Sequence, residues 1–155
     1  MVRTKRLYLY PCTKELVNKI KKRTNYPLGQ HIKHYVNLVE SDPSSLGWGA
    51  WFVIKKDDKK VIGDMGFIDK PDHEGVVEIG CNILPDAQSK GYATEATQVL
   101  IKWAFASKKV NRIIAICDLT NTPSFRVLEK VGMRRYLVRG SMVYWEITSS
   151  SFIKR

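Results

Sequence analysis

The segment Ile83-Leu84-Pro85-Asp86-Ala87-Gln88-Ser89-Lys90-Gly91-Tyr92-Ala93-Thr94-Glu95-Ala96 carries an apolar strand through a turn and into the start of a helix. At such a junction several backbone N–H groups lack a partner within the helix and can point at one anion. Gly91 allows a positive φ or the close approach of a ligand, and Lys90 adds positive charge beside these amides. The segment therefore predicts a phosphate-binding turn, for which a diphosphate is the natural ligand.

A glycine in a turn between a strand and a helix is also common where nothing binds, so an ordinary loop is the alternative interpretation. The order of the other elements decides between the two. Before the turn, the hydrophobic pattern predicts strands at 7–10, 51–54, 61–68 and 76–83. Two helices lie between the first and second of these strands. One is capped by Thr13 and runs through Leu16, Val17 and Ile20, and the other runs from Ile32 to Val39 and ends at Ser41-Asp42-Pro43. After the turn, the pattern predicts a helix from Tyr92 to about Ser107, a strand at 112–117, a helix from Pro123 or Ser124 to Lys130, strands at 133–138 and 142–147, and a frayed tail at 149–155.

This order predicts an α+β fold. The three strands between 51 and 83 form an antiparallel meander, and the almost fully apolar strand at 112–117 is expected to be covered on both faces. We therefore expect a mixed, mostly antiparallel sheet flanked by helices. The chain has 155 residues, of which 44% are hydrophobic, enough for one core, so a single domain is expected over residues 1–155.

Gln88, Gly91 and Ala93 resemble the acyl-CoA loop of the GNAT superfamily of N-acetyltransferases, in which Gln or Arg is followed after two residues by Gly and after one more by Gly or Ala. The order strand, two helices, three strands, helix, strand, helix, two strands is similar to that fold along almost the whole chain. The segments 77–85 and 121–133, with Ala104-Phe105, resemble the branch that contains the ribosomal-protein N-terminal acetyltransferases RimJ and RimL. The resemblance implies an acyltransferase with acetyl-CoA as co-substrate.

The resemblance also implies where CoA binds. Backbone groups of Ile83 and Leu84 would pair with the pantetheine arm as an added strand does, and the N–H groups from Ser89 to Thr94 would hold the diphosphate. The residues that it implies for CoA binding are Ile83, Leu84, Gln88, Ser89, Lys90, Gly91, Tyr92, Ala93, Thr94, Asn121, Ser124 and Arg126.

The last three residues of that set lie at the start of the helix expected at 123–130. Asn121 would bond the pantetheine or a nearby backbone group, although Asn and Ser at such places also serve as helix caps. Ser124 would lie near the sulfur and donate a proton to the departing thiolate, with water or no acid as alternatives, because a thiolate is a fair leaving group. Arg126 would reach the 3′-phosphate, or would be ordinary surface charge.

Gly80 lies in the middle of a predicted strand, where glycine often marks a bulge or the close approach of a ligand. The resemblance implies that a bulge here opens a gap that admits the thioester, whose carbonyl a backbone N–H near Gly80 or Cys81 would polarise. A glycine that merely permits helix packing is the alternative. Glu78 alternates with Val77 and Ile79 and so points to the opposite face. It is our candidate general base, with an ordinary solvent-facing glutamate as the alternative.

The chain carries a formal charge of +11, from 26 basic and 15 acidic residues, which favours anionic partners such as CoA. The basic residues are scattered and no nucleic-acid motif accompanies them, so nucleic acid is not expected as a partner and a solvated basic surface is the alternative. Polyamines would be repelled unless the acceptor pocket is locally acidic.

The three cysteines are far apart and without ligand spacing, so we expect buried, reduced thiols and no zinc site. His31 and His34 share a helix face, but no third ligand accompanies them and no metal is expected. A Cys81 acyl-enzyme lacks a recognisable His and acid arrangement, which favours direct attack by the amine. No apolar run approaches the roughly 20 residues that span a bilayer, and the start lacks a signal-peptide core, so a cytoplasmic protein without a membrane partner is expected.

The sequence as a whole predicts transfer of acetyl from acetyl-CoA to a primary amine by direct attack, through a tetrahedral intermediate. The amine belongs to a protein N-terminus, for example of a ribosomal protein, or to a small molecule. The two early helices and the loop near Pro71 are expected to form the acceptor region, in a monomer or homodimer. The alternative is a non-catalytic acyl-CoA or nucleic-acid binding module with the same fold.

Overall fold

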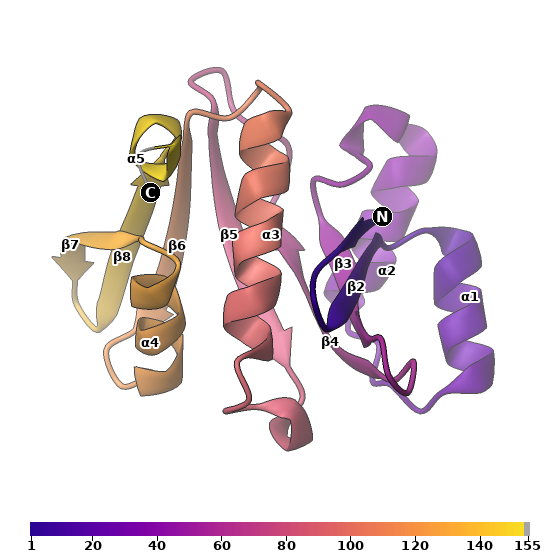
Figure 1. Ribbon diagram of the computed structural model, residues 1–155. Helices are drawn as coiled ribbons and strands as arrows, with labels where there is room; N and C mark the ends of the chain where they lie inside the picture. The colour runs from indigo at the N-terminus through magenta and orange to yellow at the C-terminus, as the bar shows by residue number, and fades with distance from the viewer. Residues whose placement is uncertain (154–155) are drawn as a thin grey trace.

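One mixed sheet runs through the computed structural model, which describes residues 1–153 (Figure 1). Its strands are β1 (Val2–Arg3), β2 (Leu7–Pro11), β3 (Ala50–Lys55), β4 (Val61–Phe67), β5 (Val76–Ile83), β6 (Arg112–Asp118), β7 (Arg134–Arg139) and β8 (Met142–Thr148). They lie in the order β1-β2-β3-β4-β5-β6-β8-β7. Neighbouring strands are antiparallel except β5 and β6, which are parallel. The expected mixed, mostly antiparallel sheet is confirmed.

Helices cover both faces of this sheet. They are α1 (Lys14–Arg23), α2 (Gln30–Ser41), α3 (Tyr92–Ala106), α4 (Thr122–Lys130) and α5 (Ser149–Ile153), with short 3-10 turns η1 (Pro43–Ser45) and η2 (Pro85–Ala87). The Thr13 side chain caps α1 by accepting a hydrogen bond from the N–H of Leu16, as expected from the sequence. None of the helices in residues 1–153 is long and apolar enough to cross a bilayer.

Two clusters of buried side chains hold the layers together. The larger cluster lies between the sheet and helices α3 and α4, and includes Leu100, Ile101, Ile113 and Trp145. The smaller cluster joins α1 and α2 to the opposite face through side chains such as Phe52. The alternation of strand residues between these two clusters explains why β3 and β4 are buried along most of their length.

The chain end differs from the expected frayed tail. Residues 149–153 form α5, while Lys154 and Arg155 lie outside the described residues. Two reciprocal hydrogen bonds cap the start of this helix. The Thr148 hydroxyl accepts from the Ser151 N–H, and the Ser151 hydroxyl accepts from the Thr148 N–H. The ring of Phe152 packs on Phe105 with the ring centroids 5.4 Å apart. Strand β1, which the sequence did not predict either, is only two residues long.

Leu100 offers a test of the larger core cluster. Its side chain is fully buried in α3, so Leu100→Ala should lower the free energy of unfolding by about 2–5 kcal/mol through lost burial and an unfilled cavity. Leu119→Ala is the matched control, because Leu119 is 48% exposed, and it should cost far less. Urea denaturation of both variants measures the difference; equal losses would contradict the assigned core.

Candidate functional site

Strands β5 and β6 pair only at their beginnings. Their register joins Val76 to Arg112, Val77 to Ile113 and Glu78 to Ile114. Strand β5 then continues to Ile83 and β6 to Asp118 without further pairing between them. The two strands therefore diverge after Glu78 and leave an opening between their carboxyl ends.

The opening does not arise from a bulge at Gly80, contrary to our expectation. The ladder between β4 and β5 runs in unbroken register from Phe67↔Ile79 to Gly63↔Ile83, with Gly80 opposite Gly66. Divergence from β6 alone produces the opening. A Cβ placed on Gly80 would meet no atom within 4 Å, so close packing by the protein does not require glycine there. Instead, the paired glycines leave a bare stretch of backbone.

The backbone of β5 presents polar groups to this opening. The Glu78 carbonyl and the Leu84 N–H both bond toward β4, so strand alternation directs the N–H and C=O groups of Cys81 and Ile83 toward the β6 side. The Ile83 carbonyl accepts a hydrogen bond from the Gln88 side chain at 2.9 Å. Both backbone groups of Leu84 are already bonded within the protein, the carbonyl to the N–H of Ala87. Cys81 is therefore better placed than Leu84 to pair with an inserted ligand.

The turn between β5 and α3 has the geometry of an anion site. Ser89 and Gly91 both have positive φ, of 62° and 83°. Within residues 1–153, no group accepts a hydrogen bond from the six consecutive amides of residues 89–94. A run of free N–H groups around αL residues at a helix start is suited to phosphate oxygens. The carbonyl of Lys90 and the carboxylate of Glu95 are both held by Arg6.

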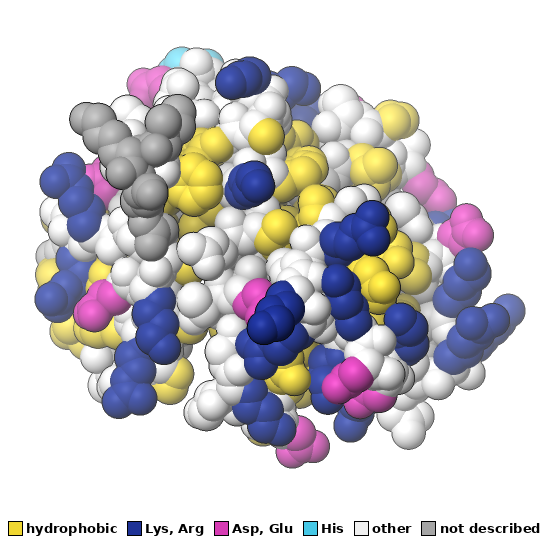
Figure 2. Space-filling model, in the orientation of Figure 1, with side chains coloured by type: hydrophobic (Ala, Val, Ile, Leu, Met, Phe, Trp, Pro, Cys, Tyr) yellow, Lys and Arg dark blue, Asp and Glu magenta, His cyan; other side chains and the backbone are white. Residues whose placement is uncertain are grey.

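Basic side chains surround this turn, which the sequence alone did not indicate. The Arg6 guanidinium lies 4.2 Å from the centroid of the Tyr92 ring, and the Lys55 ammonium lies 6.0 Å from it. Lys56 and Lys59 lie over the ring of Tyr8, which alternates with the core residues Leu7 and Leu9 and so lies on the other face of the sheet. Figure 2 shows Lys and Arg side chains spread over this face of the molecule. Arg6 and Lys55 therefore add positive charge near the expected phosphate site.

The residues expected at the start of α4 lie beyond the carboxyl end of β6. Parallel strands bring the carboxyl ends of β5 and β6 to the same edge of the sheet, where the starts of α3 and α4 also lie (Figure 1). Asn121 caps α4 by accepting from the N–H of Ser124 at 3.2 Å, so its cap role is observed. The half-buried Ser124 hydroxyl has no hydrogen-bond partner in residues 1–153, and Arg126 is exposed.

Glu78 occupies the same face of β5 as Gly80, as strand alternation predicts. Its side chain is half-buried, and burial raises the pKa of the carboxyl above its ordinary value. A carboxylate with a raised pKa close to an open stretch of strand fits the role of a general base.

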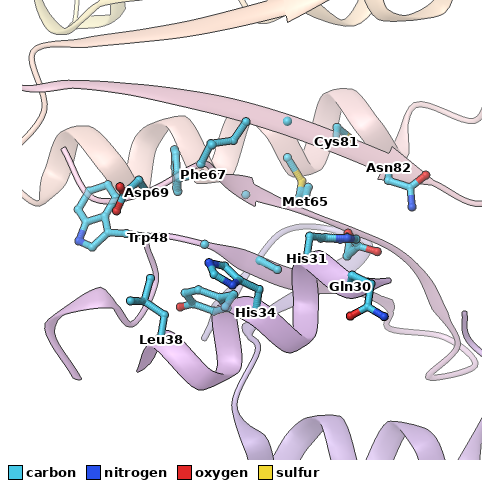
Figure 3. A pocket seen from close by; sticks show the side chains of 17 residues that line it. Gln30, His31, His34, Leu38, Trp48, Met65, Phe67, Asp69, Cys81 and Asn82 are labelled. Carbon is cyan, nitrogen blue, oxygen red and sulfur yellow. The ribbon is translucent and has the colours of Figure 1, made fainter. Parts of the chain in front are cut away.

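A cavity of about 860 Å³ adjoins Gly80 on this face. It lies between α2 and strands β3 to β5, and Figure 3 shows Trp48 and Phe67 toward one end and Asn82 toward the other, with His31 and His34 extending from α2. The loop near Pro71, which we expected to contribute, does so through Ile68 and Asp69, which follow β4, although Pro71 itself is not among the lining residues.

Asp64 is the main site residue that the sequence analysis missed. It is only 3% exposed, in the middle of β4. Its carboxylate accepts a hydrogen bond from the Tyr26 hydroxyl at 2.5 Å and lies 2.7 Å from Nε2 of His31. Desolvation and the bond to Asp64 raise the pKa of the Tyr26 hydroxyl. A single acidic residue inside a strand that is otherwise apolar or glycine was the signal that could have identified it.

The cysteines differ in part from expectation. Cys12 and Cys117 are buried, but Cys81 is exposed, beside the cavity. Desolvation by the surrounding protein and the negative charge of Asp64 raise the pKa of the Cys81 thiol to about 12, which disfavours a reactive thiolate at neutral pH. His31 contacts Asp64, and in residues 1–153 no three His, Cys, Asp or Glu side chains cluster in a way that could hold a metal.

Comparisons with known proteins agree with this architecture. Residues 6–134 match the family model described as Acetyltransferase (GNAT) domain. The N-acetyltransferase YjdG of Bacillus subtilis, itself uncharacterized, is 36% identical over 101 residues, which are 65% of this chain and 60% of YjdG. The chain spans about half to three-fifths of the length of the curated relatives it matches.

Solved structures share the fold over nearly their whole length. A GNAT-family acetyltransferase from Bacillus anthracis has a TM-score of 0.68 and 28% identity, covering 96% of this chain and 98% of that one. The ribosomal-protein-S5-alanine acetyltransferase from Vibrio fischeri has a TM-score of 0.73 and 16% identity, covering 97% of each chain. At that identity the second likeness shows the fold alone.

Substitution of Gly91 tests the anion site. A Cβ on Gly91 would be strained by its φ of 83° and would lie 3.2 Å from Nη2 of Arg6. Gly91→Ala should therefore cost about 1–2 kcal/mol of stability and weaken the binding of CoA, measured by calorimetric titration. Gly140→Ala is the matched control, because Gly140 also has a positive φ but lies in the β7–β8 turn. This control should lose stability and keep its CoA affinity. An equal fall of CoA affinity in both variants would contradict an anion site at Gly91.

Proposed function

We infer that this chain, which belongs to the acetyltransferase (GNAT) domain family, transfers an acetyl group from acetyl-CoA to a primary amine. The observation that carries the proposal is the opening between β5 and β6, which adjoins both a run of free amides and a cavity. Strand divergence can seat the thioester, the amides can hold its diphosphate, and the cavity can hold the second substrate. The opening and the cavity adjoin at Gly80, and the amides follow the carboxyl end of β5.

The opening fits an acyl-CoA arm. We propose that the backbone of Cys81 and Ile83 bonds the pantetheine as an added strand would. The amides from Ser89 to Thr94 hold the diphosphate, with Gln88 fixing the end of β5 and Arg6 fixing the turn. Lys90, Tyr92 and Ala93 shape this turn, and Arg126 and the basic side chains near Tyr92 add charge for the phosphates.

The transfer itself needs a deprotonated amine and a place for the charge that develops on the thioester. The amine nitrogen forms a bond to the carbonyl carbon, its proton passes to Glu78 directly or through water, and the bond from carbon to sulfur breaks. The Cys81 N–H, which faces the opening, polarises the carbonyl oxygen. The free hydroxyl of Ser124, or a water, returns a proton to the thiolate. Cys81 itself takes no covalent part, because its thiol stays protonated at neutral pH.

The acceptor lies in the cavity between α2, β4 and β5. We propose that it is a primary amine of a protein N-terminus or of a small molecule. The branch that contains the ribosomal-protein acetyltransferases stays a proposal, as do a cytoplasmic location and a monomeric or homodimeric state. Of the two early helices expected at the acceptor region, α2 lines the cavity, which supports the proposal, whereas no residue of α1 is among the lining residues.

Glu78→Gln tests the proposed base. The variant should lower kcat by about 10²- to 10⁴-fold while leaving acetyl-CoA affinity nearly unchanged. Because burial raises the pKa of Glu78, the folded state binds its proton more tightly, and stability falls as pH rises from the ordinary glutamate pKa through the raised value. A glutamine side chain at this position does not ionise and carries no such penalty, so the loss of activity should not come from unfolding.

The pH profile sharpens this test. In the wild type, kcat/KM should rise with pH through a pKa above the ordinary glutamate value, and that limb should be absent in the variant. Glu74→Gln is the matched control, since the Glu74 side chain is 73% exposed, and its profile should match the wild type. An unchanged kcat in Glu78→Gln would remove Glu78 from the mechanism.

Titration with acetyl-CoA, followed by a panel of amines and N-terminal peptides monitored by thiol release, tests the function as a whole. Saturable binding and amine-dependent thiol release support the transferase. Binding without turnover on any amine would favour a non-catalytic acyl-CoA module. Binding to duplex or single-stranded nucleic acid that weakens with salt and persists with CoA present would favour the nucleic-acid module.

A further inference from the structure

The charge of the cavity is opposite to that of the protein. The chain carries a net charge of +11, yet within the described residues no Lys or Arg lines the cavity. Its acidic lining residues are Asp64 and Asp69, and two histidines, His31 and His34, line it as well, of which His31 lies with Nε2 2.7 Å from the Asp64 carboxylate. An anionic acceptor would therefore find no Lys or Arg here, whereas a cationic acceptor would be attracted from the basic surface into the cavity.

Asp64 is buried without a Lys or Arg partner in the described part of the chain. Its hydrogen bonds come from Tyr26 and His31, which approach different oxygens of the carboxylate. A carboxylate has about four sites for hydrogen bonds, so both oxygens can accept a further donor. Burial of an acidic group is costly unless it is paired, and an acidic group without a Lys or Arg partner at a cavity wall is suited to a ligand cation.

The position of Asp64 along the strand sets a distance. Asp64 lies opposite Asn82, and two residues further along lie Gly66 and Gly80, on the same face of the sheet. The strand rise places Gly66 about 7 Å from Asp64, and Gly80, diagonally across the β4–β5 ladder, lies about 8 Å from it. The short side chain is held at both oxygens, so the carboxylate stays near its backbone position.

The walls between these two points are apolar. Tyr35 and Ala50 line the cavity from α2 and β3, and both are buried. The ring of Tyr35 is fixed, because its hydroxyl accepts a hydrogen bond from the N–H of Gly47 and donates one to the carbonyl of Ser45. Methylene groups can pack against these walls without leaving a polar group unpaired.

We propose that the acceptor is an alkyl amine with a second positive charge, which Asp64 binds while the reacting nitrogen lies over Gly80. This inference rests on the proposed function, which places the thioester at Gly80. A spacer of about four or five methylene groups spans the distance between the two points. Asp64 is then the residue that determines specificity, and Glu78, on the other side of Gly80, takes the proton of the reacting amine.

A comparison of matched acceptors tests the inference in the wild type. 1,4-Diaminobutane and n-butylamine share the same carbon chain and differ in the second ammonium group. The diamine should have a kcat/KM about 10- to 100-fold higher, the effect expected of one charge-assisted hydrogen bond. Equal kcat/KM values for the two acceptors would overturn the proposal without any variant.

Substitutions then assign the preference to Asp64. Asp64→Asn should bring the ratio of the two kcat/KM values close to one, mainly by raising KM for the diamine, with n-butylamine little affected. Asp57→Asn is the matched control, because Asp57 is a 76% exposed carboxylate that does not line the cavity, and it should keep the preference. Tyr26→Phe removes one hydrogen bond but leaves the charge, so it should also keep the preference. If Asp64 had only a structural role, Asp64→Asn and Tyr26→Phe would each lower kcat/KM equally for the two acceptors.

A binding measurement separates this inference from the proposed function. Calorimetric titration of the protein with 1,4-diaminobutane, without acetyl-CoA, should show saturable binding that Asp64→Asn weakens. Such binding without acetylation of any amine would support the cation site at Asp64 and contradict the proposed transferase function. Acetylation of both amines at equal rates, unaffected by Asp64→Asn, would support the transferase function and contradict the cation site at Asp64.

Discussion

The parting of β5 from β6 is the constraint on which the site depends. A pair of parallel strands normally bonds along its length, and here it bonds at only three positions. Each strand keeps a partner on its other side, β5 with β4 and β6 with β8, so the sheet remains one body despite the open edges. Helices α3 and α4 pack on the same side of the sheet and hold the two halves together through the larger core cluster. Free backbone groups at the divergence are thus a stable feature of the fold and available to a ligand.

Charge is divided between the surface and the interior of the site. Arg6 and Lys55 lie beside Tyr92 at the turn that is suited to phosphate, whereas the cavity on the other face of the sheet is lined by carboxylates, histidines and aromatic rings. The two proposed substrates therefore approach regions of opposite sign. This separation reconciles a net charge of +11 with a cationic acceptor, because the local field inside a cavity depends on the groups that line it more than on the total charge.

Hydrophobic pattern and turn residues predicted the element order and the local conformation of several segments. Hydrophobic periodicity placed the helices and the strands of the main body to within a few residues, and Thr13 was correctly predicted to cap α1. Gly91 was expected to allow a positive φ, which it has. The errors also have physical causes. The frayed tail was wrong over 149–153 because Phe152 packs on Phe105, a contact between distant residues. The bulge expected at Gly80 was wrong because divergence of β6 opens the sheet instead.

The sequence by itself determined the local features. These are the strand, turn and helix around Gly91, the alternation that places Glu78 and Val77 on opposite faces of one strand, and the order of the elements. These features depend on neighbouring residues, whose relation is fixed by backbone geometry. Tertiary structure alone decided which distant groups meet, namely Tyr26 and His31 at Asp64, and Arg6 at the turn before α3. Such contacts join residues 33 to 84 positions apart, and they form only when packing of the sheet and helices brings those segments together.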